Sequence, residues 1–141
     1  MKMNEKEMLD FAENLGRKLK AGDIIVLTGD LGAGKTTFTK GLGLGLDIHQ
    51  MIKSPTYTIV REYDEGRLPL YHMDVYRIGD DPDSIDLDDY LFGNGVTVIE
   101  WGQLLAQDLP DDYLEIIFEP LTASRHLKLI AHGKRYEAYI G

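Results

Sequence analysis

One short segment of the chain carries the residue types needed to bind a phosphate chain. From Gly29 to Thr36 the sequence reads Gly-Asp-Leu-Gly-Ala-Gly-Lys-Thr, which meets the pattern G-x-x-x-x-G-K-[ST] in full. Glycines let such a loop turn with its N–H groups facing inward, where they form a concave site for anionic oxygens. A plain glycine-rich turn is the alternative. The apolar run before the segment and the helical pattern after it favour a phosphate-binding loop.

The side chains of this loop have separate predicted roles. Lys35 would reach the β- and γ-phosphates of ATP, and the hydroxyl of Thr36 would be a ligand of Mg²⁺. Gly32 and Ala33 leave room for the phosphates, whereas Asp30 is expected to be exposed at the mouth. The predicted nucleotide-binding residues are Gly29, Asp30, Leu31, Gly32, Ala33, Gly34, Lys35, Thr36 and Thr37.

Acidic residues that would complete such a site stand at the ends of later apolar runs. One run typical of a buried strand ends at Glu100, which could hold Mg²⁺ through water or orient the attacking water. An ordinary polar strand end is the alternative. In a second strand candidate, alternation puts His72, Asp74 and Tyr76 on one face. Periodicity alone does not distinguish a functional face from the solvent side.

Two further polar segments have simpler explanations from their residues alone. Thr56 follows Ser54-Pro55 and could sense the γ-phosphate as a switch segment does, but the residues alone favour a proline-led start of a strand. Residues 80–89 hold six aspartates. They lack the glycine and the closing glutamate of a calcium-binding EF-hand loop, so we expect a solvated acidic segment.

Two helices are predicted near the loop. Apolar residues recur at helical spacing over about residues 5–20, namely Met8, Phe11, Leu15 and Leu19. A second helix is predicted over about residues 35–44, with Phe38 and Leu42 on its inner face. Three glycines are expected to weaken the end of this second helix: Gly41, Gly43 and Gly45.

Short apolar runs predict a sheet rich in strands towards the end of the chain. Residues 64–67 suit the turn of a hairpin between two of these strands. The fold class expected from the mixture is α/β, with a mixed sheet and three layers. The predicted strands cover residues 24–28, 56–60, 68–76, 96–99, 113–118, 126–130 and 136–140.

Length and composition fit one domain spanning residues 1–141. With 43% apolar and 28% charged residues, the chain has the composition of a globular domain. The absence of cysteine excludes disulfides, thiolate zinc sites and a cysteine nucleophile. The net charge of −9 argues against tight binding to nucleic acid by the chain alone. No membrane span or signal peptide is recognisable, so a cytoplasmic protein without a membrane partner is expected.

Four motifs together resemble the TsaE family of bacterial ATPases. They read GDLGAGKTT at 29–37, SPTYT at 54–58, YHMDVYR at 71–77 and IEW at 99–101, in the order found in that family. The resemblance implies a three-layer P-loop fold in which antiparallel strands extend a parallel core sheet. It also implies hydrolysis of ATP with Mg²⁺ in support of threonylcarbamoyladenosine synthesis on tRNAs that read codons starting with A. TsaB and TsaD would be the partners, and tRNA would be contacted only indirectly or weakly.

The resemblance also assigns roles to individual residues. It implies that Lys35 and Thr36 serve the phosphates and Mg²⁺, and that Glu100 is the strand-end acid that helps to hold the metal. Asp74 matches a second functional acid, and Thr56 falls in the switch-like segment. The predicted catalytic residues are therefore Lys35, Asp74, Glu100 and Thr56, and the predicted metal ligands are Thr36 and Glu100.

Two other functions share a phosphate-binding loop. A small-molecule kinase needs an acceptor pocket and usually an arginine-rich lid, and the sequence shows no such cluster of arginines. A nucleotide-gated adaptor would need nucleotide binding but not hydrolysis. The sequence also shows no obvious arginine finger beyond the candidates Arg77 and Arg125, so slow hydrolysis by the isolated chain is expected.

Overall fold

The computed structural model describes residues 2–3, 5–29, 33–49, 60–74, 94–100, 112–119 and 125–140, a few of them, Asp74 included, by their backbone alone. The described helices are α1 (Glu5–Lys18), α2 (Ala33–Gly45) and α5 (Lys134–Ile140). The described strands are β1 (Lys2–Met3), β2 (Ile24–Gly29), β3 (Val60–Tyr63), β4 (Leu70–Asp74), β5 (Val96–Glu100), β6 (Tyr113–Glu119) and β7 (Arg125–His132).

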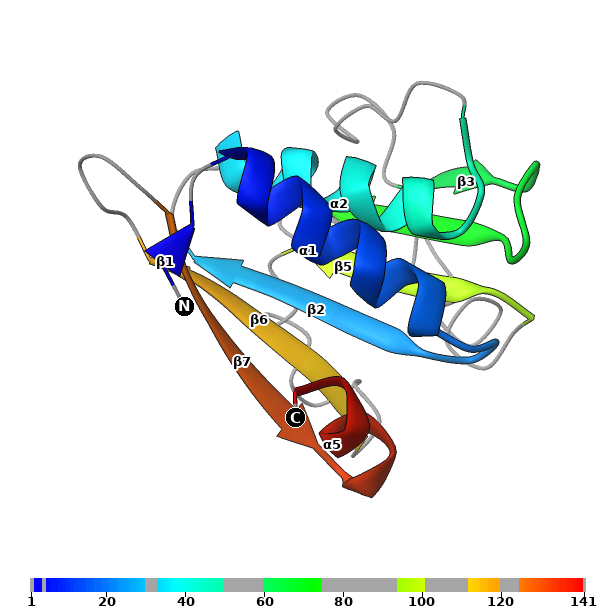
Figure 1. Ribbon diagram of the computed structural model, residues 1–141. Helices are drawn as coiled ribbons and strands as arrows, with labels where there is room; N and C mark the ends of the chain where they lie inside the picture. Colours follow the sequence, from blue (N-terminus) through cyan, green and yellow to red (C-terminus); the bar gives the residue numbers. More distant parts are fainter. Residues whose placement is uncertain are drawn as a thin grey trace.

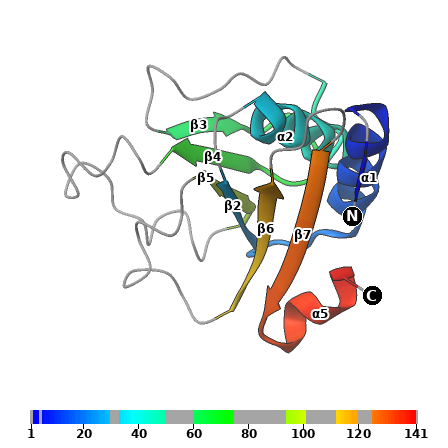
Figure 2. The same ribbon diagram turned by 90° about the vertical axis from the view of Figure 1, so that its left-hand side faces the viewer.

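The strands form one mixed sheet in the order β1-β7-β6-β2-β5-β4-β3 (Figures 1 and 2). The four central strands β6, β2, β5 and β4 run parallel to one another. The outer strands are antiparallel, β3 against β4 on one side and β7 and β1 on the other. This arrangement confirms the prediction of a parallel core sheet that antiparallel strands extend.

The three described helices cover the same face of the sheet (Figure 2). Ile25 and Leu27 of β2 point to this face and belong to one core cluster with Phe38 of α2 and Tyr136 of α5. On the opposite face Ile24, Val26 and Ile99 are buried as well. Burial on both faces explains why β2 and β5 read as continuous apolar runs. Two of the three expected layers lie within the described residues.

Helices α1 and α2 pack closely because glycines line their contact. A Cβ atom built on Gly45 would lie 2.2 Å from the carbonyl oxygen of Glu13 and 2.7 Å from the Cα atom of Gly16. Helix α2 still runs through the three glycines expected to weaken it and ends at Gly45, close to its predicted end. The missing side chains allow the two backbones to approach, and this contact offsets the low helix propensity of glycine.

Two other predictions from periodicity are corrected by the structure. Residues 134–140 form helix α5 and not a strand, because Tyr136 and Tyr139 are spaced to face the core from one side of a helix. The strand predicted over residues 56–60 is found at Val60–Tyr63 in the described part, and residues 56–59 lie outside it. The predicted hairpin is confirmed, since β3 and β4 pair antiparallel around residues 64–69.

The turn of this hairpin is tied to the ends of both long helices. The Arg67 guanidinium donates through Nη2 to the carbonyl oxygens of Gly16 and Leu19, at 2.9 and 3.2 Å. The Arg67 backbone N–H donates to the carbonyl oxygen of Leu46 at 2.7 Å. These bonds satisfy carbonyl groups that a helix end leaves without partners. They also fix β4, which carries His72 and Asp74, relative to α1 and α2.

Candidate functional site

The predicted site residues stand where parallel strands end. In the sheet register Glu100, the last residue of β5, lies between Leu27 of β2 and Asp74, the last residue of β4. Strand β2 continues to Gly29, about 7 Å further along the strand at the usual rise per residue. Ligands of open α/β sheets bind at this carboxyl edge. The fold therefore brings Gly29, Glu100 and the backbone of Asp74 to one edge.

Helix α2 begins four residues after β2 ends and carries the lysine and threonine of the loop motif in its first turn, Ala33 to Thr36. This turn contains no acidic residue, so the positive end of the helix dipole is not neutralised locally. The side chain of Lys35 is almost fully buried, with 1% of its surface exposed, whereas Thr36 and Thr37 are half-buried. The arrangement suits an anion with several oxygens.

Glu100 is paired with a histidine of the neighbouring strand. The Nε2 atom of His72 lies 2.8 Å from Oε2 of Glu100, and the exposed fractions of the two side chains are 0% and 6%. Because an ionised carboxylate only accepts hydrogen bonds, Nε2 must carry the proton and donate it. His72 is therefore on the buried side of β4, whereas the side chains of Asp74 and Tyr76 lie outside the described part.

The second nitrogen of the histidine ring, Nδ1, is not satisfied by a hydrogen bond from the described residues. This atom is also buried. The sequence pattern predicts only that His72 lies on a polar strand face, and it assigns the residue no partner. Its pairing with Glu100 depends on β4 lying next to β5 in the sheet. Local sequence patterns do not reveal which strands are neighbours.

Several predicted site residues lie outside the described residues. Of Asp74 only the backbone is described, so the role of its carboxylate stays a prediction. The roles of Lys35, Thr36 and Glu100 as ligands or catalysts also stay predictions, although the fold places them around one strand edge. Outside the described part lie Asp30, Leu31, Gly32 and Thr56.

The donor set fits Mg²⁺ held mainly by a nucleotide. Among the described side chains, no three from His, Cys, Asp and Glu gather into a group that could hold a metal ion. Mg²⁺ commonly keeps several waters and binds one or two protein oxygens together with substrate phosphates. The Thr36 hydroxyl and the Glu100 carboxylate are hard oxygen donors of that kind, so the residues present suit this ion.

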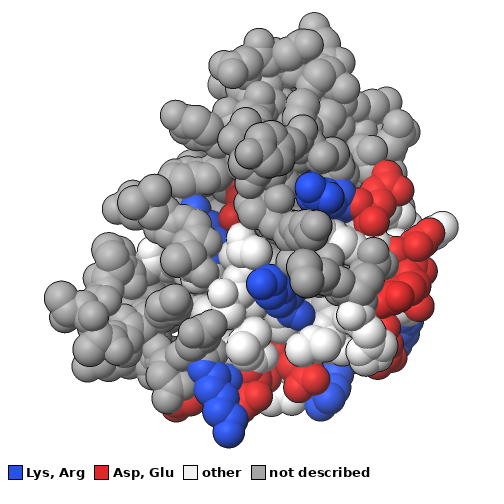
Figure 3. Space-filling view, turned by 90° about the horizontal axis from the view of Figure 1, so that it is seen from above, with Lys and Arg blue, Asp and Glu red and all other residues white. Residues whose placement is uncertain are grey.

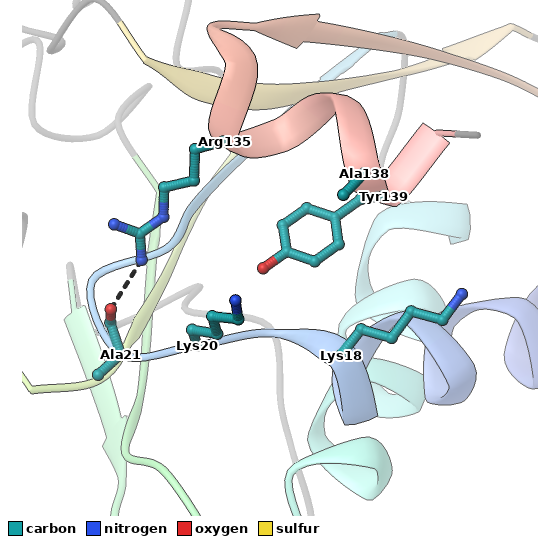
Figure 4. A pocket seen from close by; sticks show the side chains of 6 residues that line it. All are labelled: Lys18, Lys20, Ala21, Arg135, Ala138 and Tyr139. Atoms are coloured by element: carbon teal, nitrogen blue, oxygen red, sulfur yellow. Dashed lines mark hydrogen bonds between the residues drawn. The ribbon is translucent and has the colours of Figure 1, made fainter.

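The opposite end of the sheet holds a second polar cluster, next to a pocket of about 660 Å³ (Figure 4). Asp23, fully buried before β2, accepts hydrogen bonds from Arg135 Nε and the Tyr139 hydroxyl, both at 2.6 Å. It also accepts one from the Lys20 N–H at 2.7 Å. Figure 4 shows the Arg135 guanidinium reaching the carbonyl oxygen of Ala21. Arg135 and Tyr139 of α5 thus tie this helix to the residues before β2.

This cluster shifts the ionisation of its members. Burial first, and then the hydrogen bond and the charge of Asp23, raise the pKa of the Tyr139 phenol. Burial lowers the pKa of Arg135, but the hydrogen bond and the charge of Asp23 outweigh burial and raise it. Both shifts favour the protonated forms, a neutral phenol and a cationic guanidinium, which donate hydrogen bonds to one carboxylate. Such an arrangement serves the stability of the fold.

Comparisons with known proteins show which family this chain belongs to. A profile of the family described as "Threonylcarbamoyl adenosine biosynthesis protein TsaE" matches residues 2–127. The tRNA threonylcarbamoyladenosine biosynthesis protein TsaE of Bacillus subtilis (strain 168) is 45% identical over 136 residues, which cover 96% of this chain and 86% of the relative. The protein of the same name from Treponema pallidum (strain Nichols) is 45% identical over 123 residues, which cover 86% and 84%.

A solved structure has the same architecture. The crystal structure of Bacillus subtilis YdiB matches with a TM-score of 0.85 and 41% identity, covering 98% of this chain and 87% of that one. The mixed sheet with its parallel core thus defines a protein of the P-loop ATPase fold. More narrowly, the chain belongs to the TsaE family, whose members take part in the biosynthesis of threonylcarbamoyladenosine in tRNA. In the part that the structure describes, no helix has the length and apolar character to cross a membrane.

Proposed function

We propose that the chain binds ATP with Mg²⁺ at the carboxyl edge of its sheet and hydrolyses it to support threonylcarbamoyladenosine synthesis in the cytoplasm. The observation that carries this proposal is the position of buried Lys35 in the acid-free first turn of α2, four residues after the end of β2. Strand β2 is itself paired with β5, the strand that ends in Glu100. A lysine is rarely buried to this degree unless it serves a negatively charged group.

In this proposal the chain's own groups act mainly by position and charge. The loop N–H groups, the start of α2 and Lys35 bind the phosphate oxygens and stabilise the charge that spreads over them during transfer to water. Thr36 and Glu100 would hold Mg²⁺, which neutralises phosphate charge when bound. Glu100, and Asp74 from the adjacent strand end, would orient the attacking water. Thr56 would sense the γ-phosphate.

TsaB and TsaD are the partners we propose, and tRNA would be contacted only weakly. The net charge of −9 is unfavourable for autonomous binding to a phosphate backbone. On the face seen in Figure 3, acidic and basic side chains are interspersed over the described surface, without a continuous basic area among the described residues in that view. Delivery of the tRNA by other proteins of the pathway fits this surface better.

Steady-state ATP hydrolysis tests the proposal. The isolated chain should release phosphate slowly, and adding TsaB and TsaD from the same organism should raise the rate. Glu100→Gln should lower phosphate release by about 100-fold, a typical loss for an acid–base or water-positioning group, while ADP affinity changes by less than about threefold. Rapid turnover that neither the partners nor Glu100→Gln changes would contradict the proposal. Transfer of phosphate to a small acceptor would indicate a kinase instead.

A further inference from the structure

The carboxylate of Glu100 is held from one side. Its Oε2 atom contacts Nε2 of His72, and Oε1 makes no hydrogen bond to another described residue. Glu100 is 5% exposed and stands at the end of β5, so its side chain has little solvent to replace a missing partner. A carboxylate in this state keeps several lone-pair sites for a further ligand.

His72 lies in the sheet between Arg61 of β3 on one side and strand β5 on the other. Its register partner on β5 is Val98, and Leu70, two residues earlier on the same face of β4, is fully buried. A histidine here leaves Nδ1 buried without a partner in the described part, which is unfavourable for folding. An apolar side chain would fill the same position without that cost. Packing alone therefore does not explain a histidine at this position.

We propose that His72 is a positioning residue for Glu100. By donating its Nε2–H to Oε2, it fixes the orientation of the carboxylate and leaves Oε1 available to Mg²⁺ or its bound water. Loss of a partner that orients a ligating group in this way typically lowers metal affinity by about 10- to 100-fold. This inference rests on the proposed function, since it needs a metal–nucleotide complex at the strand ends.

Two isosteric variants separate this role from simple packing. Glutamine places its amide nitrogen close to where Nε2 of histidine lies, whereas the shorter asparagine places it near Nδ1. Calorimetry with ADP, once with Mg²⁺ and once with EDTA, gives the factor by which Mg²⁺ strengthens binding. His72→Gln should keep the factor of the unchanged protein, and His72→Asn should lower it about 10-fold or more. ADP affinity in EDTA should be the same in all three proteins.

The outcomes distinguish the inference from the proposed function. An unchanged protein in which Mg²⁺ fails to strengthen ADP binding would contradict the proposed function. Equal Mg²⁺ factors in all three proteins, with ADP still bound, would overturn the role of His72 alone. If His72→Asn fails to fold, ¹⁵N spectra of the histidine rings in the unchanged protein decide, with His72→Gln used for assignment. A protonated Nε2 whose shift responds to Mg²⁺ is expected, and an unprotonated Nε2 would overturn the inference.

Discussion

Two buried carboxylates, one at each end of the parallel strands, differ in how completely they are satisfied. Asp23 accepts hydrogen bonds from a backbone N–H, a guanidinium and a phenol, at 2.6–2.7 Å. Glu100 accepts one, from a histidine whose other nitrogen has no partner within the described residues. Burying a charge is costly unless it is paired and hydrogen-bonded, so the first carboxylate stabilises the fold and the second retains binding capacity for a ligand.

The comparison teaches that burial alone does not mark a functional acid. Both carboxylates are at least 95% buried, and both contact a nitrogen group that can be cationic. The difference lies in the unused capacity around Glu100 and in its place on the carboxyl edge, in register with Leu27 of β2. If this account is correct, substitutions at one end should change binding, and those at the other should change stability.

The largest expected effect comes from Lys35. Lys35→Ala should weaken ADP binding with Mg²⁺ by at least about 100-fold, because charge-assisted bonds to phosphate oxygens are lost in a site with little water. The matched control is Lys40→Ala, since Lys40 is an exposed lysine of the same helix. Calorimetry should show unchanged affinity for that control. Similar affinities for both variants would break the assignment of binding to the first turn of α2.

At the other end, Asp23→Asn should lower the free energy of unfolding by about 2 kcal/mol. Loss of one partner from a buried pair costs more than this, but Arg135 is 44% exposed and water replaces part of its interaction. ADP affinity should change by less than about twofold. Urea denaturation measures the effect, and Asp10→Asn, at an exposed position of α1, is the control. If Asp23→Asn lost nucleotide binding but kept its stability, Asp23 would be the binding carboxylate, contrary to this account.

A smaller, pH-dependent effect is expected at Tyr139. Burial and Asp23 raise its pKa, so the folded state favours the neutral phenol. The stability this phenol contributes is therefore complete below about pH 10, the ordinary pKa, and is lost as pH rises above that value.

Tyr139→Phe should lower stability by about 1 kcal/mol at pH 8 and reduce the decline above pH 10. Denaturation midpoints between pH 8 and 11 measure both changes. Part of the decline should remain, because burial also raises the pKa of Tyr136 and Tyr113. An unchanged alkaline slope would show that Tyr139 does not ionise with unfolding.

The central part of the fold could be predicted because its signals are local. Strand β2 is an apolar run that leads into a glycine-rich loop and a helix, and strand β5 is a second run closed by an acid. Both are buried on two faces, which gives long apolar runs without alternation. The hairpin of β3 and β4 likewise follows from its turn residues.

The remaining parts depend on contacts between distant segments. The seven residues of α5 fit strand alternation and helical spacing about equally, and only the packing of Tyr136 and Tyr139 against the core decides. The tie between Asp23 and Arg135 joins residues 112 positions apart. The pairing of His72 with Glu100 likewise needs the strand order. Local sequence patterns contain no information on these contacts.

Amide hydrogen exchange with and without ADP and Mg²⁺ tests the division between the two ends most directly. The account predicts slower exchange in residues 29–37 and 96–100 when the nucleotide is present, and no change in residues 19–24 and 134–139. Slower exchange around Asp23 and α5 with none around α2, or no response anywhere in the chain, would contradict it.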